Sequence, residues 1–526
     1  MPKTSRSFLC RSLLHLLLLT MMGLFGSGSI ASATLSQDET PGIAYRLVPR
    51  TDPAFPHLEI SVAIPVLNHE EAISVQMPVW SPGDYHVQDH SQYLQNLSAW
   101  SGDPTLGKRL PVTRIRMHTW MVATQGAESV TVTYVLPVTP PGFFSENVQI
   151  LPKQVFVNGP AAYVYVLNRK TERVSLTIRL PQEWQAVMAL SEKQAGDEIT
   201  FTAPDYDTLA DSPLVMAHKE VLKIESFVHS GKRHRAVFFS NSEAIRDTKE
   251  YRAVLTRIVE SYQRIMGSLP YSQYAFFFDV GGRGGGLEHL NGTRMAIGGQ
   301  SAKGIAHFAA HEYFHLWNVK RIRPKVLGPF DYIEPPKTRN LWFSEGVTDY
   351  YAGLCVRRAG FITESDFLKR WERSVRAYQT DPNYRKTSAD ESSLRVWEAG
   401  NSSGYGINYY FKGMLIGLCL DLKIRHITQN KRSLDDVMRE LMKRTNLPKQ
   451  GFEEDEIRDV VNLIAGEDLT AFYNLLARTS DPMPFKECLG YAGLDISGKP
   501  LENATPEQIA LRKEWVKTFF PAKEGE

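Results

Sequence analysis

The sequence of 526 residues predicts an α+β protein with a β-rich amino-terminal part and a largely helical carboxy-terminal part. Two observations carry this prediction. Between about residues 40 and 220, hydrophobic and polar residues alternate with a period of two, which is typical of half-buried strands. After about residue 220 the hydrophobic period lengthens, and long amphipathic helices become the main pattern.

Pro/Gly-rich breaks such as SPGD and TPPG separate the predicted strands of the first part. Short strands with such breaks favour a β-sandwich-like or saddle-like arrangement, which we expect for residues 34–220. The predicted strands are HLEISVAIPV, AISVQMPVW, RIRMHTWMVAT, SVTVTYVLPV and RVSLTIRL.

Residues 221–360 mix both periods, and residues 361–526 read as helical throughout. A long amphipathic helix is predicted in SEAIRDTKEYRAVLTRIVESYQRIMG, and the last helix begins with a capping-box pattern, Thr505 to Gln508, with Pro506 in its first turn. The strands predicted in this region are VLKIESFVH, HRAVFFS, YAFFFDV and TRMAIGG.

Residues 1–33 have the three parts of an export signal. These are a basic start, MPKTSRSFLCR, an apolar run, SLLHLLLLTMMGLFG, and small residues, ASA, at the cleavage position. The apolar run is shorter than the roughly 20 residues that span a bilayer. We therefore expect an exported protein, periplasmic or secreted, with no stable membrane insertion after signal removal; an uncleaved anchor is the alternative.

The charge balance gives no support for a nucleic-acid partner. The formal net charge is +2, and 57 basic residues face 58 acidic ones once the signal is removed. Three cysteines remain in the mature chain, Cys355, Cys419 and Cys488, without the spacing of a metal site. Buried structural thiols are the expected interpretation.

The five residues HEYFH at 311–315 fit the zinc motif H-E-x-x-H. His311 and His315 lie one helical turn apart, about 6 Å along the axis, so both can hold one tetrahedral zinc. Glu312 then borders the open coordination position, where it can deprotonate a bound water. His307 shares the face, but its spacing favours packing or a supporting role. Two core histidines beside an unrelated glutamate are the alternative.

A third ligand is available in NLWFSEGVTDYYAGLCVRR. Glu345 lies 30 residues after His315 in a segment with helical spacing. Asp349, four residues further, shares its face and can accept the spare N–H of a ligand histidine. A solvated acidic pair is the alternative. A rival pair, His86 and His90 in HVQDH, is disfavoured because it lies in the β-rich part and lacks the expected glutamate.

With these residues in view, the chain resembles the glycyl aminopeptidase family of gluzincin zinc metallopeptidases. The matching segments are WSPGDY, GGGLEHLNGT, HEYFHLWNVKRIRP, LWFSEGVTDYY and YYFKGMLIGLCLDLKIR. The resemblance implies a thermolysin-like catalytic domain between the β-rich domain and a helical subdomain. It also implies one Zn²⁺ per chain, held by His311, His315 and Glu345, with Glu312 as base and proton shuttle. Many members continue into a PDZ domain, which we do not expect in the about thirty residues after CLGYAGLDI.

The resemblance assigns two further roles. Glu288, in GGRGGGLEHL, would hold the free α-amino group of the substrate through a charge-assisted hydrogen bond. Gly285 and Gly286 would let the peptide approach the backbone closely. Tyr410 would donate to the oxyanion of the reaction, although the adjacent Tyr409 leaves this assignment open. A glycine hairpin with a surface glutamate, and a helix-packing tyrosine, are the alternatives.

The function that the sequence favours is a zinc aminopeptidase that acts on peptide substrates and, by family likeness, releases a small first residue, Gly or Ala. An endopeptidase with the same chemistry is one alternative. A peptide-binding or scaffold protein with a non-catalytic zinc site is another. Nothing in the sequence fixes the oligomeric state.

Overall fold

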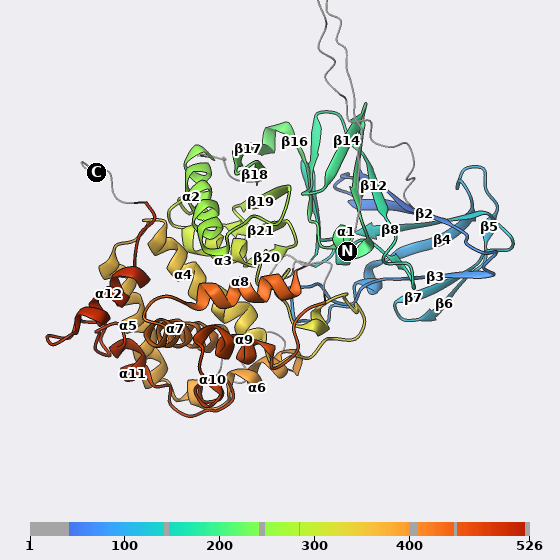
Figure 1. Cartoon of the computed structure of the whole chain (residues 1–526). Coiled ribbons are helices and arrows are strands. Elements are labelled where there is room, and N and C mark those ends of the chain that lie inside the picture. The colour runs from blue at the N-terminus through green and yellow to red at the C-terminus, as the bar shows by residue number, and fades with distance from the viewer. Residues whose placement is uncertain are drawn as a thin grey trace, which may run out of the picture. The chain divides into compact units, whose positions relative to one another are not determined.

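The structure, a computed structural model, describes residues 42–140, 142, 147–240, 248–282, 284–398, 409–446 and 450–520. The predicted signal at 1–33 therefore lies outside the described residues. Within them, every strand precedes Ala306, and every α-helix except the first two begins at or after it (Figure 1). The α+β prediction, with strands first and helices later, is confirmed.

Three sheets form the amino-terminal part. The first has eight strands in the order β14 (Ser191–Ala195), β15 (Glu198–Ala203), β12 (Val174–Arg179), β1 (Ile43–Arg50), β2 (His57–Pro65), β8 (Ser129–Pro137), β4 (Gln95–Ser101) and β5 (Arg109–Leu110). The second has the order β13 (Trp184–Val187), β16 (Leu214–His218), β10 (Gln154–Val157) and β9 (Val148–Leu151). The third has the order β11 (Tyr165–Val166), β3 (Ala72–Gln76), β7 (Thr119–Ala123) and β6 (Val112–Arg116).

Alternating burial along β2 shows why the period-two pattern predicted this strand. Every second side chain faces a shared core, and the residues between them are more exposed. One prediction was wrong: RIRMHTWMVAT is not one strand but forms parts of β6 and β7, which pair antiparallel. The turn falls at Met117 and His118, and no glycine or proline marks it in the sequence.

A five-stranded sheet forms the floor of the second part. Its order is β17 (Leu222–His229), β18 (Lys232–Phe239), β19 (Gln273–Val280), β21 (Gly292–Ile297) and β20 (Gly286–His289). Phe238 and Phe276 pack toward the helices, whereas Val237 and Phe277 pack toward the β13–β16–β10–β9 sheet. Both faces of this sheet are therefore covered, which explains the continuous apolar run YAFFFDV.

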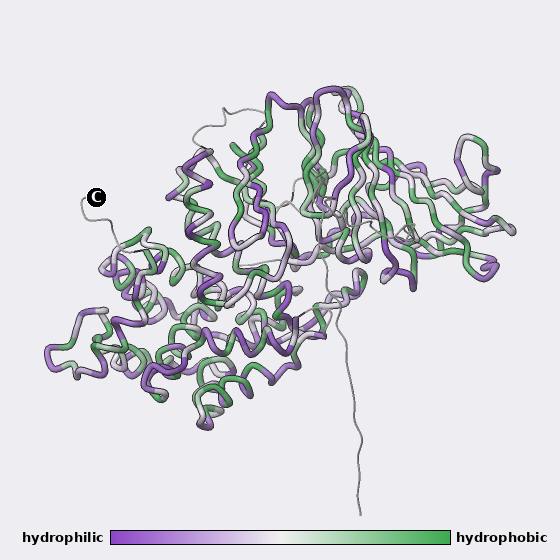
Figure 2. Tube along the Cα trace, turned by 45° about the horizontal axis from the view of Figure 1, so that its top comes forward, coloured by the Kyte–Doolittle hydropathy of each residue, from purple (hydrophilic) through white to green (hydrophobic). Residues whose placement is uncertain are grey.

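The helices share one hydrophobic core with the near face of the five-stranded sheet. In Figure 2, hydrophobic residues alternate with hydrophilic ones along these helices. The capping box predicted at Thr505 and Gln508 is present at the start of the last helix. The helices are α1 (Tyr206–Ala210), α2 (Thr248–Met266), α3 (Ala306–Phe314), α4 (Thr348–Arg358), α5 (Glu364–Thr380), α6 (Ala389–Leu394), α7 (Tyr409–Ile427), α8 (Leu434–Thr445), α9 (Glu456–Ala465), α10 (Thr470–Ala477), α11 (Phe485–Gly490) and α12 (Pro506–Trp515).

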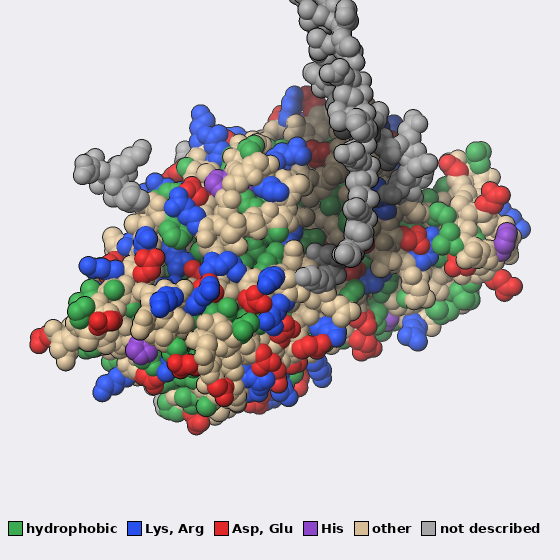
Figure 3. All heavy atoms as spheres, in the orientation of Figure 1, with side chains coloured by type: hydrophobic (Ala, Val, Ile, Leu, Met, Phe, Trp, Pro, Cys, Tyr) green, Lys and Arg blue, Asp and Glu red, His purple; other side chains and the backbone are tan. Residues whose placement is uncertain are grey.

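The surface carries both signs of charge. Figure 3 shows Lys and Arg side chains interspersed with Asp and Glu on the face in view. No helix in the described part of the chain combines the length and the hydropathy that crossing a bilayer requires. The cysteines Cys355, Cys419 and Cys488 are buried free thiols, as predicted.

Candidate metal centre and active site

Helix α3 carries His311 and Glu312, and His315 follows directly after its last residue. The helix is held in place because Ala309, Ala310, Tyr313 and Phe314 are fully buried in the core. The two imidazoles turn the same nitrogen toward each other, with His311 Nε2 3.1 Å from His315 Nε2. The spacing of the H-E-x-x-H motif therefore brings the two imidazoles together on one side of the helix, as the sequence predicted.

Each of these rings is fixed through its other nitrogen. His315 Nδ1 donates to the carbonyl of Asn318 at 2.8 Å, and His311 Nδ1 lies 3.5 Å from Asp349 Oδ1. Such contacts set the tautomer and orientation of a metal-ligating imidazole. Asp349 thus lies where the sequence placed it, and Arg370 contacts its other oxygen at 3.2 Å.

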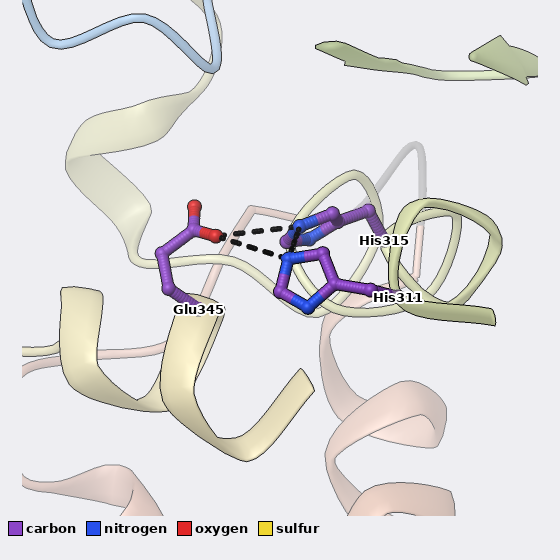
Figure 4. Close-up of side chains that lie close together, drawn as sticks. All are labelled: His311, His315 and Glu345. Atoms are coloured by element: carbon purple, nitrogen blue, oxygen red, sulfur yellow. Dashed lines mark hydrogen bonds and ion pairs between the residues drawn. The ribbon is translucent and has the colours of Figure 1, made fainter. Parts of the chain in front are cut away.

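Glu345 completes a group of three convergent ligand atoms. Its Oε2 lies 3.3 Å from His315 Nε2 and 3.8 Å from His311 Nε2, as Figure 4 shows. An ion with bonds of 2.0–2.2 Å in tetrahedral geometry needs ligand atoms about 3.4 Å apart. In the described residues this trio is the only group of three or more such side chains close enough for one ion. The donor set and its spacing fit zinc.

Glu345 lies in a π-helical turn, Trp342–Val347, which continues into α4. The sequence predicted an ordinary helix there, so the turn is a correction. The turn crosses α7 very closely: a Cβ on Gly346 would lie 2.4 Å from Gly413 Cα, and a Cβ on Gly413 would lie 2.1 Å from the Trp342 carbonyl oxygen. Single π turns are frequent at functional sites, and this one carries the third ligand.

We expect Gly413→Ala to destabilise the protein by about 1–3 kcal/mol, because the added methyl overpacks this crossing. Urea unfolding measures the change. Gly490→Ala is the matched control: Gly490 also lies in a helix, but a Cβ there would meet nothing within 4 Å. Equal stability of the two variants would contradict the close crossing.

Glu312 is buried and lies beside the metal trio. Burial raises its pKa to about 7, although the nearby His311 and His315 charges oppose this rise. The opposite holds for Glu345: burial alone would raise its pKa, but the charge of His315 and the hydrogen bonds of both histidines lower it to about 2. A carboxylate with a pKa near neutrality is suited to accept and return a proton.

Glu288 faces the same site from strand β20. Its side chain is only 5% exposed, and its Oε1 is buried with no hydrogen-bond partner among the described residues. The loop before Tyr85 covers it: a Cβ on Gly83 would lie 2.8 Å from Glu288 Oε1 and 2.9 Å from Oε2. The surface-hairpin alternative for Glu288 is therefore wrong, because this carboxylate is buried.

A cavity of about 500 Å³ joins these groups. Tyr410 lines it and stacks 6.3 Å from the His311 ring, whereas Tyr409 does not line it. The remaining lining residues come from the loop before Tyr85, from β20 and the residue before it, from α3 and the residue after it, from the π turn, and from α4 and α7. They are Gly83, Gly285, Gly286, Glu288, His307, Phe308, His311, Glu312, His315, Glu345, Asp349 and Phe411. The volume matches that of a small-ligand site.

The rival histidine pair, His86 and His90, is not brought into this cavity. His86 is exposed, and His90 is buried in the amino-terminal part outside any such group of ligands in the described residues.

His307 lies 3.5 Å from Asp349 and lines the cavity, in the supporting place predicted for it.

Sequence reasoning missed Gly83 and Thr293. Gly83 was visible only as part of WSPGDY, and its contact with Glu288 joins residues more than 200 positions apart. Thr293 lies opposite Glu288 in the β20–β21 pair, and only the strand register reveals this. No local pattern marks either residue.

Family models match parts of this sequence, and solved structures share its fold. The M61 peptidase N-terminal domain matches residues 48–218, and the M61 glycyl aminopeptidase model matches residues 305–416. The chain is similar to a solved aminopeptidase N family protein from Idiomarina loihiensis, with 27% identity and a TM-score of 0.76 over 86% of this chain and 78% of that one. A comparison with curated proteins found no match.

Two further solved structures share the fold. One is an M1 zinc metallopeptidase from Deinococcus radiodurans, with 12% identity and a TM-score of 0.53 over 84% of this chain and 94% of that one. The other is yeast LTA4 hydrolase in complex with bestatin, with 11% identity and a TM-score of 0.52 over 86% and 71%. The two family models together cover more than half of the sequence. The chain therefore belongs to the M61 glycyl aminopeptidase family, and it is a peptidase.

Proposed function

We propose that the protein is an exported zinc aminopeptidase that removes a small first residue, Gly or Ala, from peptides, with one zinc per chain. The observation that carries the aminopeptidase activity is the buried Oε1 of Glu288. This atom has no hydrogen-bond partner in the described part of the chain, and Glu288 lines the cavity that the metal trio also lines. A buried carboxylate oxygen is costly without a partner, and the ammonium group of a peptide supplies one.

The residues divide the chemistry among them. His311, His315 and Glu345 would hold zinc, which supplies Lewis-acid polarisation of the scissile carbonyl and activates a water. Glu312 takes the proton of the attacking water and passes it to the leaving amine. The hydroxyl of Tyr410 donates a hydrogen bond to the oxyanion that develops on the carbonyl.

The positions of the acidic groups set the direction of the peptide. Glu288 lines one cavity with Glu312 and the metal trio, so the amino end of the substrate would be held beside the metal site. Gly83 packs against Glu288 and closes the amino end, which supports removal of single residues.

Export and the small first residue have separate support. The three-part pattern of residues 1–33 supports export to the periplasm or beyond. The description of the matching family, glycyl aminopeptidase, supports Gly as the first residue. Peptides are the proposed partners; nucleic acids and stable membrane insertion are not part of the proposal.

We expect free alanine and glycine anilides to be hydrolysed and their acetylated forms to be resistant, because acetylation removes the charge that Glu288 binds. Glu288→Gln should raise KM for the free anilides by about 10- to 100-fold, which corresponds to the loss of one hydrogen bond between charged groups. Steady-state kinetics on both substrate forms measures this. Equal hydrolysis of the acetylated forms would instead favour an endopeptidase.

A further inference from the structure

Thr293 touches the carboxylate of Glu312. Its side chain is fully buried, and its Oγ1 lies 3.3 Å from Glu312 Oε2 and 3.1 Å from the carbonyl oxygen of Leu287. The hydroxyl has one proton and two acceptors within reach. An ionised carboxylate is the stronger of the two acceptors.

The other oxygen of Glu312 is confined by the neighbouring strand. A Cβ on Gly286 would lie 2.3 Å from Glu312 Oε1, so the bare backbone of β20 packs directly against this atom. In the register of the sheet, Glu288 pairs with Thr293 and Gly286 pairs with Met295. Side chains of directly opposed residues share a face, so one strand pair carries both the amine-binding carboxylate and the contacts of Glu312.

We propose that Thr293 is a positioning residue that holds the Glu312 carboxylate in its proton-accepting orientation; this rests on the proposed role of Glu312 as base. Glu312 lies near two other carboxylates, Glu288 and Glu345, which repel it. Steric confinement by Gly286 limits the space on one side but supplies no attraction. The Thr293 hydroxyl supplies the attraction on the other side.

The test replaces the hydroxyl and keeps the shape. Thr293→Val should lower kcat for alanine anilide by about 10- to 100-fold, the effect of losing a hydrogen bond to a charged group. KM should change less than about twofold, since the amine is held by Glu288. Bound zinc, measured by atomic absorption, should stay at the wild-type ratio. Thr293→Ser should restore most of kcat.

The control is a threonine of similar burial outside the site. Thr119 in β7 is 1% exposed, and its hydroxyl accepts from Gln76 at 2.7 Å. Thr119→Val removes a buried hydroxyl and should leave kcat unchanged. If Thr293→Val does not fold, as judged by circular dichroism, Thr293→Ala replaces it, because alanine removes the hydroxyl and adds no atom.

Glu312→Gln measured in parallel separates two failures. If Glu312→Gln is inactive while the valine or alanine variant keeps wild-type kcat, the positioning role is wrong and the proposed function stands. A serine variant as slow as the valine variant also overturns the positioning role. If Glu312→Gln keeps wild-type activity, the proposed mechanism itself is wrong.

Discussion

Replacement of Glu312 by glutamine is expected to lower kcat for peptide hydrolysis by about a thousandfold, the usual weight of a positioned general base. Glutamine keeps the size and most of the polarity of the side chain but cannot accept the proton of water. The side chain is buried next to both ligand histidines, so no solvent base can take its place easily. Steady-state kinetics with alanine anilide measures the loss.

The zinc content decides what such a loss means. Glu312 is not one of the three convergent ligand residues, so the variant should bind zinc at the wild-type ratio. An inactive variant that still holds zinc supports the base. Retained hydrolysis with zinc bound would refute this role.

Removal of a ligand is expected to have a comparable effect through a different cause. Glu345→Ala and His315→Ala should each lose bound zinc and with it all measurable hydrolysis. Each variant keeps only two protein ligands, which are too few to hold the ion tightly. A chelator should inactivate the wild-type protein, and added zinc should restore it. Atomic absorption and kinetics on the same samples measure both quantities.

The matched control is the rival histidine pair of the amino-terminal part. His86→Ala removes an exposed imidazole from HVQDH and should leave one zinc per chain and full activity. A drop in stoichiometry in this variant would reveal a second site. A His315→Ala variant with undiminished zinc would contradict the assignment of the trio.

The sequence predicted the histidine pair because its geometry is local, whereas Glu345 was proposed as the third ligand from a second segment and from the family resemblance. Helical spacing alone brings His311 beside His315, and a second helical segment with its acidic residues on one face supplies Glu345. The strand pattern was equally readable in β2, where burial alternates along the strand.

Features that depend on contacts between distant segments could not be read in this way. The π turn at Glu345 crosses α7 where Gly346 meets Gly413, and nothing in the sequence around either glycine indicates this contact. The contact of Gly83 with Glu288 joins a loop of the β-rich part to strand β20. The split of RIRMHTWMVAT into β6 and β7 falls at residues that form strands as readily as turns.

A crystal structure of the zinc-loaded protein, with anomalous diffraction recorded at the zinc absorption edge, tests the central claim most directly. The account predicts one strong anomalous peak per chain, about 2.0–2.2 Å from His311 Nε2, His315 Nε2 and a carboxylate oxygen of Glu345. A peak elsewhere, or these three side chains turned away from one another in the loaded protein, would contradict it.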